Sequence, residues 1–172
     1  MKGIVLFKGK YGATMQYAIW VAAALNTQAI KAEFVSEKDL SGLDYVIIGT
    51  SVYIGKLQLA NWLRQHAAWL KGKKLIFFIV AGTPLHETEK LRSYYEGGVP
   101  ALLRDQAGVH FLPGSLRFKK LSLMDKLLLT MGSRMAKWRG ENINTKDYNS
   151  VSREHIQPIL NELHNLQPEL QH

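Results

Sequence analysis

The residues best suited to chemistry in this sequence lie in the stretch LFKGKYGATMQYA, directly after the first apolar run. Gly9 and Gly12 allow positive φ angles and a close approach of the backbone to a ligand. Lys8 and Lys10 add positive charge, and the first amides of the following helix carry the positive end of its dipole. These features indicate a phosphate-binding loop. The alternative is a tight turn in which Thr14 caps the helix and the lysines are solvated.

Two known nucleotide-binding motifs fit this stretch poorly. The Walker pattern requires Gly-Lys-Ser/Thr, whereas Gly12 is followed by Ala13 and Thr14. The dinucleotide pattern requires a third glycine, which is missing, although Glu33 stands at a suitable distance for its acidic residue. A dinucleotide site therefore stays a weak alternative.

Two later loops have the composition of ligand-binding loops. GTSVYIGK (49–56) combines hydroxyls, exposed amides and Tyr53, whose ring suits stacking on a flat ligand; the alternative makes Tyr53 a half-buried loop aromatic. VAGTP (80–84) presents backbone groups after another strand. The candidate binding residues of the three loops are Lys8, Gly9, Lys10, Tyr11, Gly12, Ala13, Thr14, Thr50, Ser51, Val52, Tyr53, Ile54, Gly55, Ala81, Gly82 and Thr83.

Strands and helices alternate along the chain. Short apolar segments predict strands at 2–7, 29–35, 44–49, 74–80 and 108–114, several of them apolar enough to be covered on both faces. Apolar residues at helical spacing predict helices through 18–25, 59–70, 87–98 and 155–166. The alternation predicts one α/β domain over 1–172. Its doubly wound, five-stranded parallel sheet has the flavodoxin-like order 2-1-3-4-5, with helices on both faces and a ligand crevice between the loops 8–13 and 50–56.

A basic segment spans residues 117–139. It carries seven Lys or Arg and one Asp, which gives +6 of the formal +8 of the whole chain. An apolar stripe runs along it, the pattern of a helix in a membrane interface, and Gly132-Ser133 is a potential interruption. The stripe comprises Leu121, Met124, Leu128, Met131, Met135 and Trp138. The alternative is an ordinary helix packed on the sheet, and no recognition motif supports nucleic acid.

The composition excludes several classes of protein. The chain has no cysteine, so it has no disulfide or thiolate metal site and is compatible with the cytosol. Its first apolar run is too short for a signal peptide, and its longest is shorter than the roughly 20 residues of a membrane-spanning helix. The six histidines lack metal-ligand spacing, so no metal is expected. We expect a cytoplasmic protein with peripheral contact at the inner face of the cell membrane.

The first loop resembles the signature of the flavodoxins. Six positions match the family: the aliphatic residues Val5 and Leu6, the aromatic Phe7, the small residue Gly12, and then Thr14 and Ala18. Gly9 departs from it, because the family has Ser or Thr there as a hydroxyl donor to the phosphate of flavin mononucleotide (FMN). The resemblance implies an FMN cofactor whose phosphate lies at the first loop and whose ring lies between the other two.

The chain is also similar to the menaquinone-dependent protoporphyrinogen IX dehydrogenases. This resemblance lies in three segments: VIIGTSVYIGK, the GSLRF that begins at Gly114, and the basic Leu- and Met-rich segment that follows it. It implies a peripheral membrane enzyme of haem synthesis that passes electrons from a porphyrinogen to a quinone. The propionates of the porphyrinogen would bind to the cations Arg117, Lys119 and Lys120. The quinone would reach the enzyme from the lipid bilayer. We assign no catalytic acid or base.

Two other functions remain open. One is a flavodoxin-type electron carrier without its own substrate, although such carriers are usually acidic and this chain has a pI of ≈ 9.7. The other is a flavin-free binding module that keeps only the fold.

Overall fold

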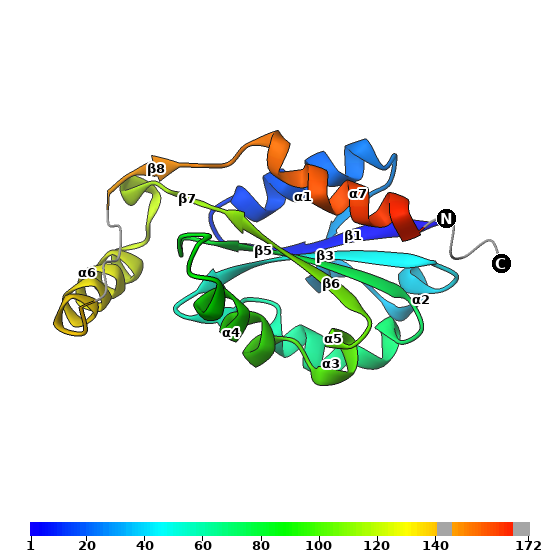
Figure 1. Cartoon of the computed structure of the whole chain (residues 1–172), viewed down its shortest axis with the longest axis horizontal. Helices are drawn as coiled ribbons and strands as arrows, with labels where there is room; N and C mark the ends of the chain where they lie inside the picture. Colours follow the sequence, from blue (N-terminus) through cyan, green and yellow to red (C-terminus); the bar gives the residue numbers. More distant parts are fainter. Residues whose placement is uncertain (141–145, 167–172) are drawn as a thin grey trace.

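A mostly parallel sheet forms the centre of the molecule (Figure 1). The computed structural model describes residues 1–140 and 146–166. The parallel strands lie in the order β2-β1-β3-β5-β6, which is the predicted order 2-1-3-4-5 when they are counted along the chain. The predicted α/β fold is therefore confirmed. The strands are β1 (Gly3–Lys8), β2 (Ala29–Lys31), β3 (Tyr45–Tyr53), β5 (Lys74–Ala81) and β6 (Ala107–Pro113).

Helices cover both faces of the sheet (Figure 1). On one face lie α1 (Ala13–Ala24) and α7 (Gln157–Leu166). On the other lie α2 (Glu37–Leu40), α3 (Ala60–Leu70), α4 (Thr88–Gly98) and α5 (Ala101–Arg104). Strand β1 explains why the predicted strands are continuously apolar: Ile4 and Leu6 enter one core, and Val5 and Phe7 enter the other.

Two strands differ in length from their predictions. The segment predicted at 29–35 forms only a three-residue strand, because Ala32–Phe34 turns into the 3₁₀ helix η1 and buries Ala32. The strand predicted at 44–49 instead continues to Tyr53 and pairs antiparallel with β4 (Lys56–Leu57). Residues 50–53, expected in a loop, therefore belong to a hairpin.

Helix α1 is fixed in place by a buried tyrosine. Tyr17 is fully buried, and its hydroxyl donates a hydrogen bond of 2.9 Å to the carbonyl of Pro113 at the end of β6. The same hydroxyl lies 3.1 Å from Nδ1 of His155, in the 3₁₀ helix η3 (Arg153–Ile156) that precedes α7. These contacts fix the start of α1 relative to the carboxyl ends of the strands.

A further group of elements lies beyond those carboxyl ends. It comprises β7 (Ser115–Leu116), the 3₁₀ helix η2 (Phe118–Lys120), α6 (Leu123–Trp138) and β8 (Tyr148–Asn149), with β7 and β8 paired antiparallel. Helix α6 stands apart from both helical layers (Figure 1). It runs through Gly132 and Ser133 without the interruption considered above.

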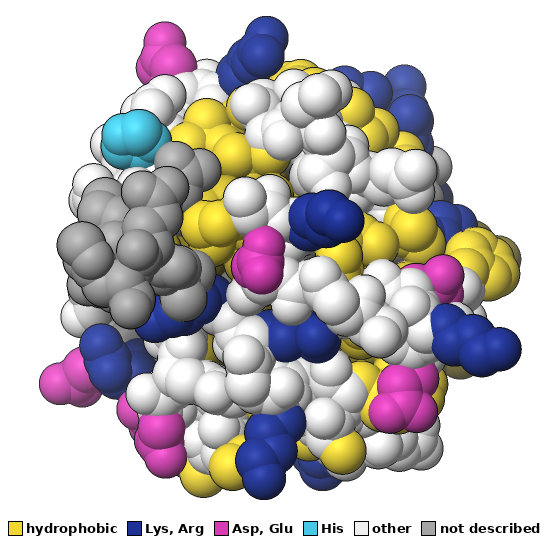
Figure 2. All heavy atoms as spheres, turned by 90° about the vertical axis from the view of Figure 1, so that its right-hand side faces the viewer, with side chains coloured by type: hydrophobic (Ala, Val, Ile, Leu, Met, Phe, Trp, Pro, Cys, Tyr) yellow, Lys and Arg dark blue, Asp and Glu magenta, His cyan; other side chains and the backbone are white. Residues whose placement is uncertain are grey.

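The face at the opposite end of the molecule has a mixed surface. Figure 2 shows Lys and Arg side chains interspersed with Asp and Glu side chains there. The concentration of positive charge in the sequence lies in residues 117–139, which include α6.

Candidate functional site

The turn after β1 leaves the first amides of α1 open. Gly12 is the N-cap residue with φ of 94°, and its carbonyl accepts the first helical hydrogen bond from the amide of Gln16 at 2.9 Å. No side chain caps this end, and the first turn holds no acidic residue. The amides and the dipole together suit an anion. The alternative in which Thr14 caps the helix is wrong, because Thr14 is the second helical residue.

Gly9 packs directly against Thr14. A Cβ atom added at Gly9 would lie 2.5 Å from Oγ1 of Thr14 and 2.6 Å from its Cβ, and Thr14 is only 1% exposed. The volume that a side chain at position 9 needs is therefore filled by the side chain of Thr14 in the first turn of α1. In this chain a side chain at position 9 therefore requires Thr14 to shift.

The second wall of the site is the β3–β4 hairpin. Its turn residues Ile54 and Gly55 have φ of 49° and 69°, so both adopt the left-handed conformation of a two-residue turn. Such a conformation strains a β-branched residue, and Ile54 is 62% exposed at the tip. Thr50 is buried, and its hydroxyl accepts a hydrogen bond from the amide of Leu59 at 3.2 Å. Thr50 therefore supports the base of the hairpin, and Tyr53 stands at its end.

A small cavity lies where the three predicted loops meet; we call it the crevice. Its volume is ≈ 80 Å³. The predicted residues that line it are Lys10, Tyr11, Ala13, Thr14, Ser51, Val52, Tyr53, Ala81 and Gly82. Lys8 and Gly9 instead line a neighbouring cavity of ≈ 420 Å³ with Lys10, Lys31 and Glu33. Gly12, Thr50, Ile54, Gly55 and Thr83 support these loops without lining either cavity.

Sequence reasoning missed part of the crevice wall. Ser115 and Tyr148 line it from the β7–β8 pair, together with Gly114 just before β7. The Tyr148 hydroxyl lies so close to Gly82 that an added Cβ there would be 2.8 Å from it. Burial raises the pKa of Tyr148. Tyr148 pairs with β7 from far along the chain, and no local sequence pattern marks that pairing.

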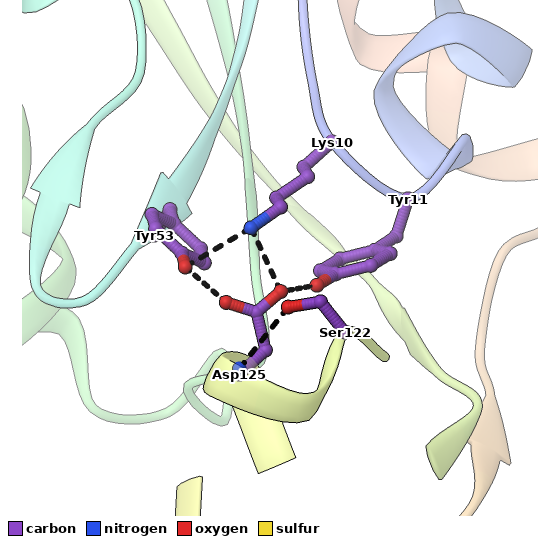
Figure 3. Close-up of polar contacts among 5 residues, drawn as sticks. All are labelled: Lys10, Tyr11, Tyr53, Ser122 and Asp125. Carbon is purple, nitrogen blue, oxygen red and sulfur yellow. Dashed lines mark hydrogen bonds and ion pairs between the residues drawn. The ribbon is translucent and has the colours of Figure 1, made fainter. Parts of the chain in front are cut away.

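A buried carboxylate joins both sides of the crevice (Figure 3). Asp125, which is 6% exposed, accepts hydrogen bonds from the hydroxyls of Tyr11 and Tyr53 and forms an ion pair of 2.7 Å with Nζ of Lys10. Ser122, the N-cap residue of α6, accepts a hydrogen bond from the Asp125 amide at 3.2 Å. We call these five residues the Asp125 cluster. The carboxylate is buried at low cost because each of its oxygens is hydrogen-bonded.

Lys10 spans the mouth of the crevice. Its ammonium donates a hydrogen bond of 3.1 Å to the Tyr53 hydroxyl and lies 4.3 Å from the centroid of the Tyr53 ring. The hydrogen bond to Asp125, and next the one to Tyr53, raise the pKa of Lys10. Lys10 is therefore a protonated cation held between the first loop and the hairpin.

Comparison with known proteins identifies the family. A family described as the flavodoxin domain matches residues 4–142. The chain belongs to the flavodoxin-domain family. This fold is consistent with a flavin-binding redox protein, and no curated protein sequence matches the chain significantly.

Solved structures similar to this flavodoxin domain share little sequence with it. Smu.1420 from Streptococcus mutans has 11% identity and a TM-score of 0.50, with 77% of this chain and 96% of that chain covered. The two-electron reduced flavodoxin of Megasphaera elsdenii has 18% identity and a TM-score of 0.49, with 63% and 84% covered. Flavodoxin 1 of Bacillus cereus has 18% identity and a TM-score of 0.43, with 80% and 98% covered.

The basic segment of this flavodoxin domain is exposed. Arg117, Lys119 and Lys120 lie at the surface before α6 and do not line the crevice. Within the predicted apolar stripe only Leu121 is buried, whereas Trp138 is 96% exposed. The stripe therefore does not pack on the sheet as the alternative required. Among the described residues no helix is both long enough and apolar enough to cross a membrane.

Replacing Gly9 with Ser tests the packing of the first loop. We expect Gly9→Ser to destabilise the fold by about 1–3 kcal/mol, because the new Cβ overlaps the buried Thr14 side chain. For a chain of this size the melting temperature should fall by about 2–4 °C per kcal/mol. Gly97→Ser is the matched control, since nothing lies within 4 Å of a Cβ at that helical position. An unchanged melting temperature in Gly9→Ser would contradict the packing.

Proposed function

We propose that this protein is an FMN-dependent oxidoreductase that transfers electrons from a porphyrinogen to a quinone. The observation that carries the flavin assignment is the uncapped start of α1 at the edge of the crevice, with Lys10 beside it. Family membership supports it independently. The porphyrinogen and quinone assignments rest on the sequence resemblance and on the exposed basic segment.

The residues of the crevice fit FMN in their chemistry. The main-chain amides at the start of α1 would hold the phosphate. Lys10, and Lys8 from the neighbouring cavity, would neutralise its charge. Tyr53 would lie against the ring, and the backbone of residues 81–83 would border it. Bound FMN would supply the redox chemistry, taking electrons from the porphyrinogen and giving them to the quinone. Protein groups would bind, orient and shield the reactants.

The three cations before α6 suit the carboxylates of a porphyrinogen. Arg117, Lys119 and Lys120 are exposed, and they follow Ser115, which lines the crevice, by only a few residues. A propionate held there would keep the tetrapyrrole near the flavin site. Arginine and lysine both bind carboxylates through charge-assisted hydrogen bonds.

Anaerobic reconstitution tests this function in two steps. Purified protein titrated with FMN should give a perturbed flavin absorbance spectrum, because the ring leaves water for a protein site. The loaded protein should then oxidise protoporphyrinogen IX when a menaquinone analogue is present, and Arg117→Glu/Lys119→Glu/Lys120→Glu should raise the KM for the porphyrinogen.

The outcomes separate the alternatives. Bound FMN without porphyrinogen oxidation would favour an electron carrier. No FMN binding at all would favour a flavin-free module and would contradict the proposal.

We also propose that α6 binds an anionic membrane surface. Its exposed apolar residues include Leu123 at 85% and Trp138 at 96%, and the surrounding segment carries seven Lys or Arg. The one acidic residue of that segment, Asp125, is buried and paired with Lys10, so it does not repel anionic lipids. An apolar face flanked by cations favours the interface of a negatively charged bilayer.

Vesicle sedimentation tests the membrane proposal. Wild-type protein should sediment with vesicles of phosphatidylglycerol and phosphatidylcholine, and less with phosphatidylcholine alone. Lys119→Glu/Lys120→Glu/Lys137→Glu should weaken binding by a hundredfold or more, since each surface cation contributes roughly 1 kcal/mol. The matched control Lys2→Glu/Lys38→Glu/Lys71→Glu has the same net charge and should sediment like the wild type. Equal losses in both variants, or a wild type that stays in solution, would contradict the proposal.

A further inference from the structure

Asp125 connects parts of the chain that are far apart in sequence. It is the third residue of α6, and its partners Tyr11 and Lys10 belong to the first loop, 114 and 115 positions earlier. Tyr53, at the end of β3, is 72 positions away. One side chain therefore fastens the start of α6 to both walls of the crevice (Figure 3).

This connection coincides with a narrow crevice. The crevice volume of ≈ 80 Å³ is well below the roughly 300–1,000 Å³ of typical small-molecule sites. Lys10 lies across it, with its ammonium over the Tyr53 ring at 4.3 Å and within 2.7 Å of the Asp125 carboxylate. A planar ligand that stacks on this face of Tyr53 would therefore displace the Lys10 ammonium.

The charges indicate competition for Lys10. An anionic ligand at the start of α1 gains most from Lys10 when that ammonium is free to approach it. In the present arrangement the Asp125 carboxylate already neutralises Lys10 and accepts hydrogen bonds from both tyrosines. Ligand and carboxylate would therefore compete for the same cation.

We propose that Asp125 is a built-in competitor of the anionic ligand: it keeps the crevice narrow through Lys10, Tyr11 and Tyr53, and ligand binding releases it together with the start of α6. The proposal rests on the flavin-binding function proposed above, with the FMN phosphate as the competing anion. Occupancy of the crevice is thereby coupled to the position of the exposed basic helix.

The direction in which one substitution changes FMN affinity shows whether Asp125 competes with the ligand or supports the loops. Asp125→Asn keeps the shape of the side chain and removes its charge. If Asp125 competes with the ligand, the dissociation constant of FMN should fall at least tenfold. If Asp125 only supports the loops, FMN binding should weaken. Asp105→Asn, at an exposed position after α5, makes the same change in net charge and should leave FMN binding unchanged.

Tryptic cleavage supplies a readout that needs no flavin. Lys126, Arg134 and Lys137 lie within α6 and report on its opening. Without ligand, Asp125→Asn should be cleaved in α6 at least fivefold faster than wild type and Asp105→Asn. Addition of FMN should accelerate cleavage of the wild type.

The results separate the two proposals. Equal or weaker FMN binding by folded Asp125→Asn overturns the competition. Unchanged cleavage of that variant overturns the attachment of α6 through Asp125, which we call the latch. If neither the wild type nor Asp125→Asn binds FMN, the flavin proposal fails. Faster cleavage of Asp125→Asn would still support the latch in that case. If Asp125→Asn fails to fold, Tyr11→Phe provides a second test because it removes one hydrogen bond to the carboxylate. It should also lower the dissociation constant of FMN, by a smaller factor than Asp125→Asn, and an unchanged or higher value would overturn the competition.

Discussion

The uncapped N-terminus of α1 is the feature on which the proposed flavin binding depends. In a parallel sheet with β1 between β2 and β3, the loop after β1 must enter a helix near the centre of the sheet edge. Gly12 makes that entry with a left-handed conformation and offers no side chain to the first amides. The resulting positive niche has no partner on its own helix, and this favours an external anion.

Asp125 accounts for the arrangement of the remaining groups around that niche. The sequence of the basic segment places a single carboxylate among seven cations, and the structure buries it against Lys10 and two tyrosines. An unpaired carboxylate at this depth would be costly, so the pairing orders the first loop, the hairpin and the start of α6 together. The apolar face of α6 is then left in solvent beyond the sheet and is flanked by cations, and the proposed contact with an anionic membrane rests on this arrangement.

Local patterns predicted the fold well because they reflect local causes. Continuous apolar runs mark strands buried on both faces, and β1 divides its side chains between the two cores as such a strand must. The same reasoning missed the hairpin, because Thr50, Ser51 and Tyr53 have the polarity of a loop while pairing as a strand. It also overestimated the length of β2, because the buried residue Ala32 belongs to a 3₁₀ helix and not to the strand.

The candidate site was predictable only where it is contiguous in sequence. The three loops were found from glycines, hydroxyls and the rule that ligands bind at the carboxyl ends of the strands. Tyr148 and Asp125 were not found, because their contacts join segments separated by dozens of residues. The only available signals were that Asp125 is the sole acid of the basic segment and that it lies three residues after Ser122, a suitable N-cap.

A crystal structure of the protein with FMN would show directly where the phosphate binds. We expect its oxygens to lie about 3 Å from the main-chain amides at the start of α1, with the ring between Tyr53 and the loop after β5. A phosphate bound elsewhere, for example in the neighbouring cavity beside Lys31, would contradict it.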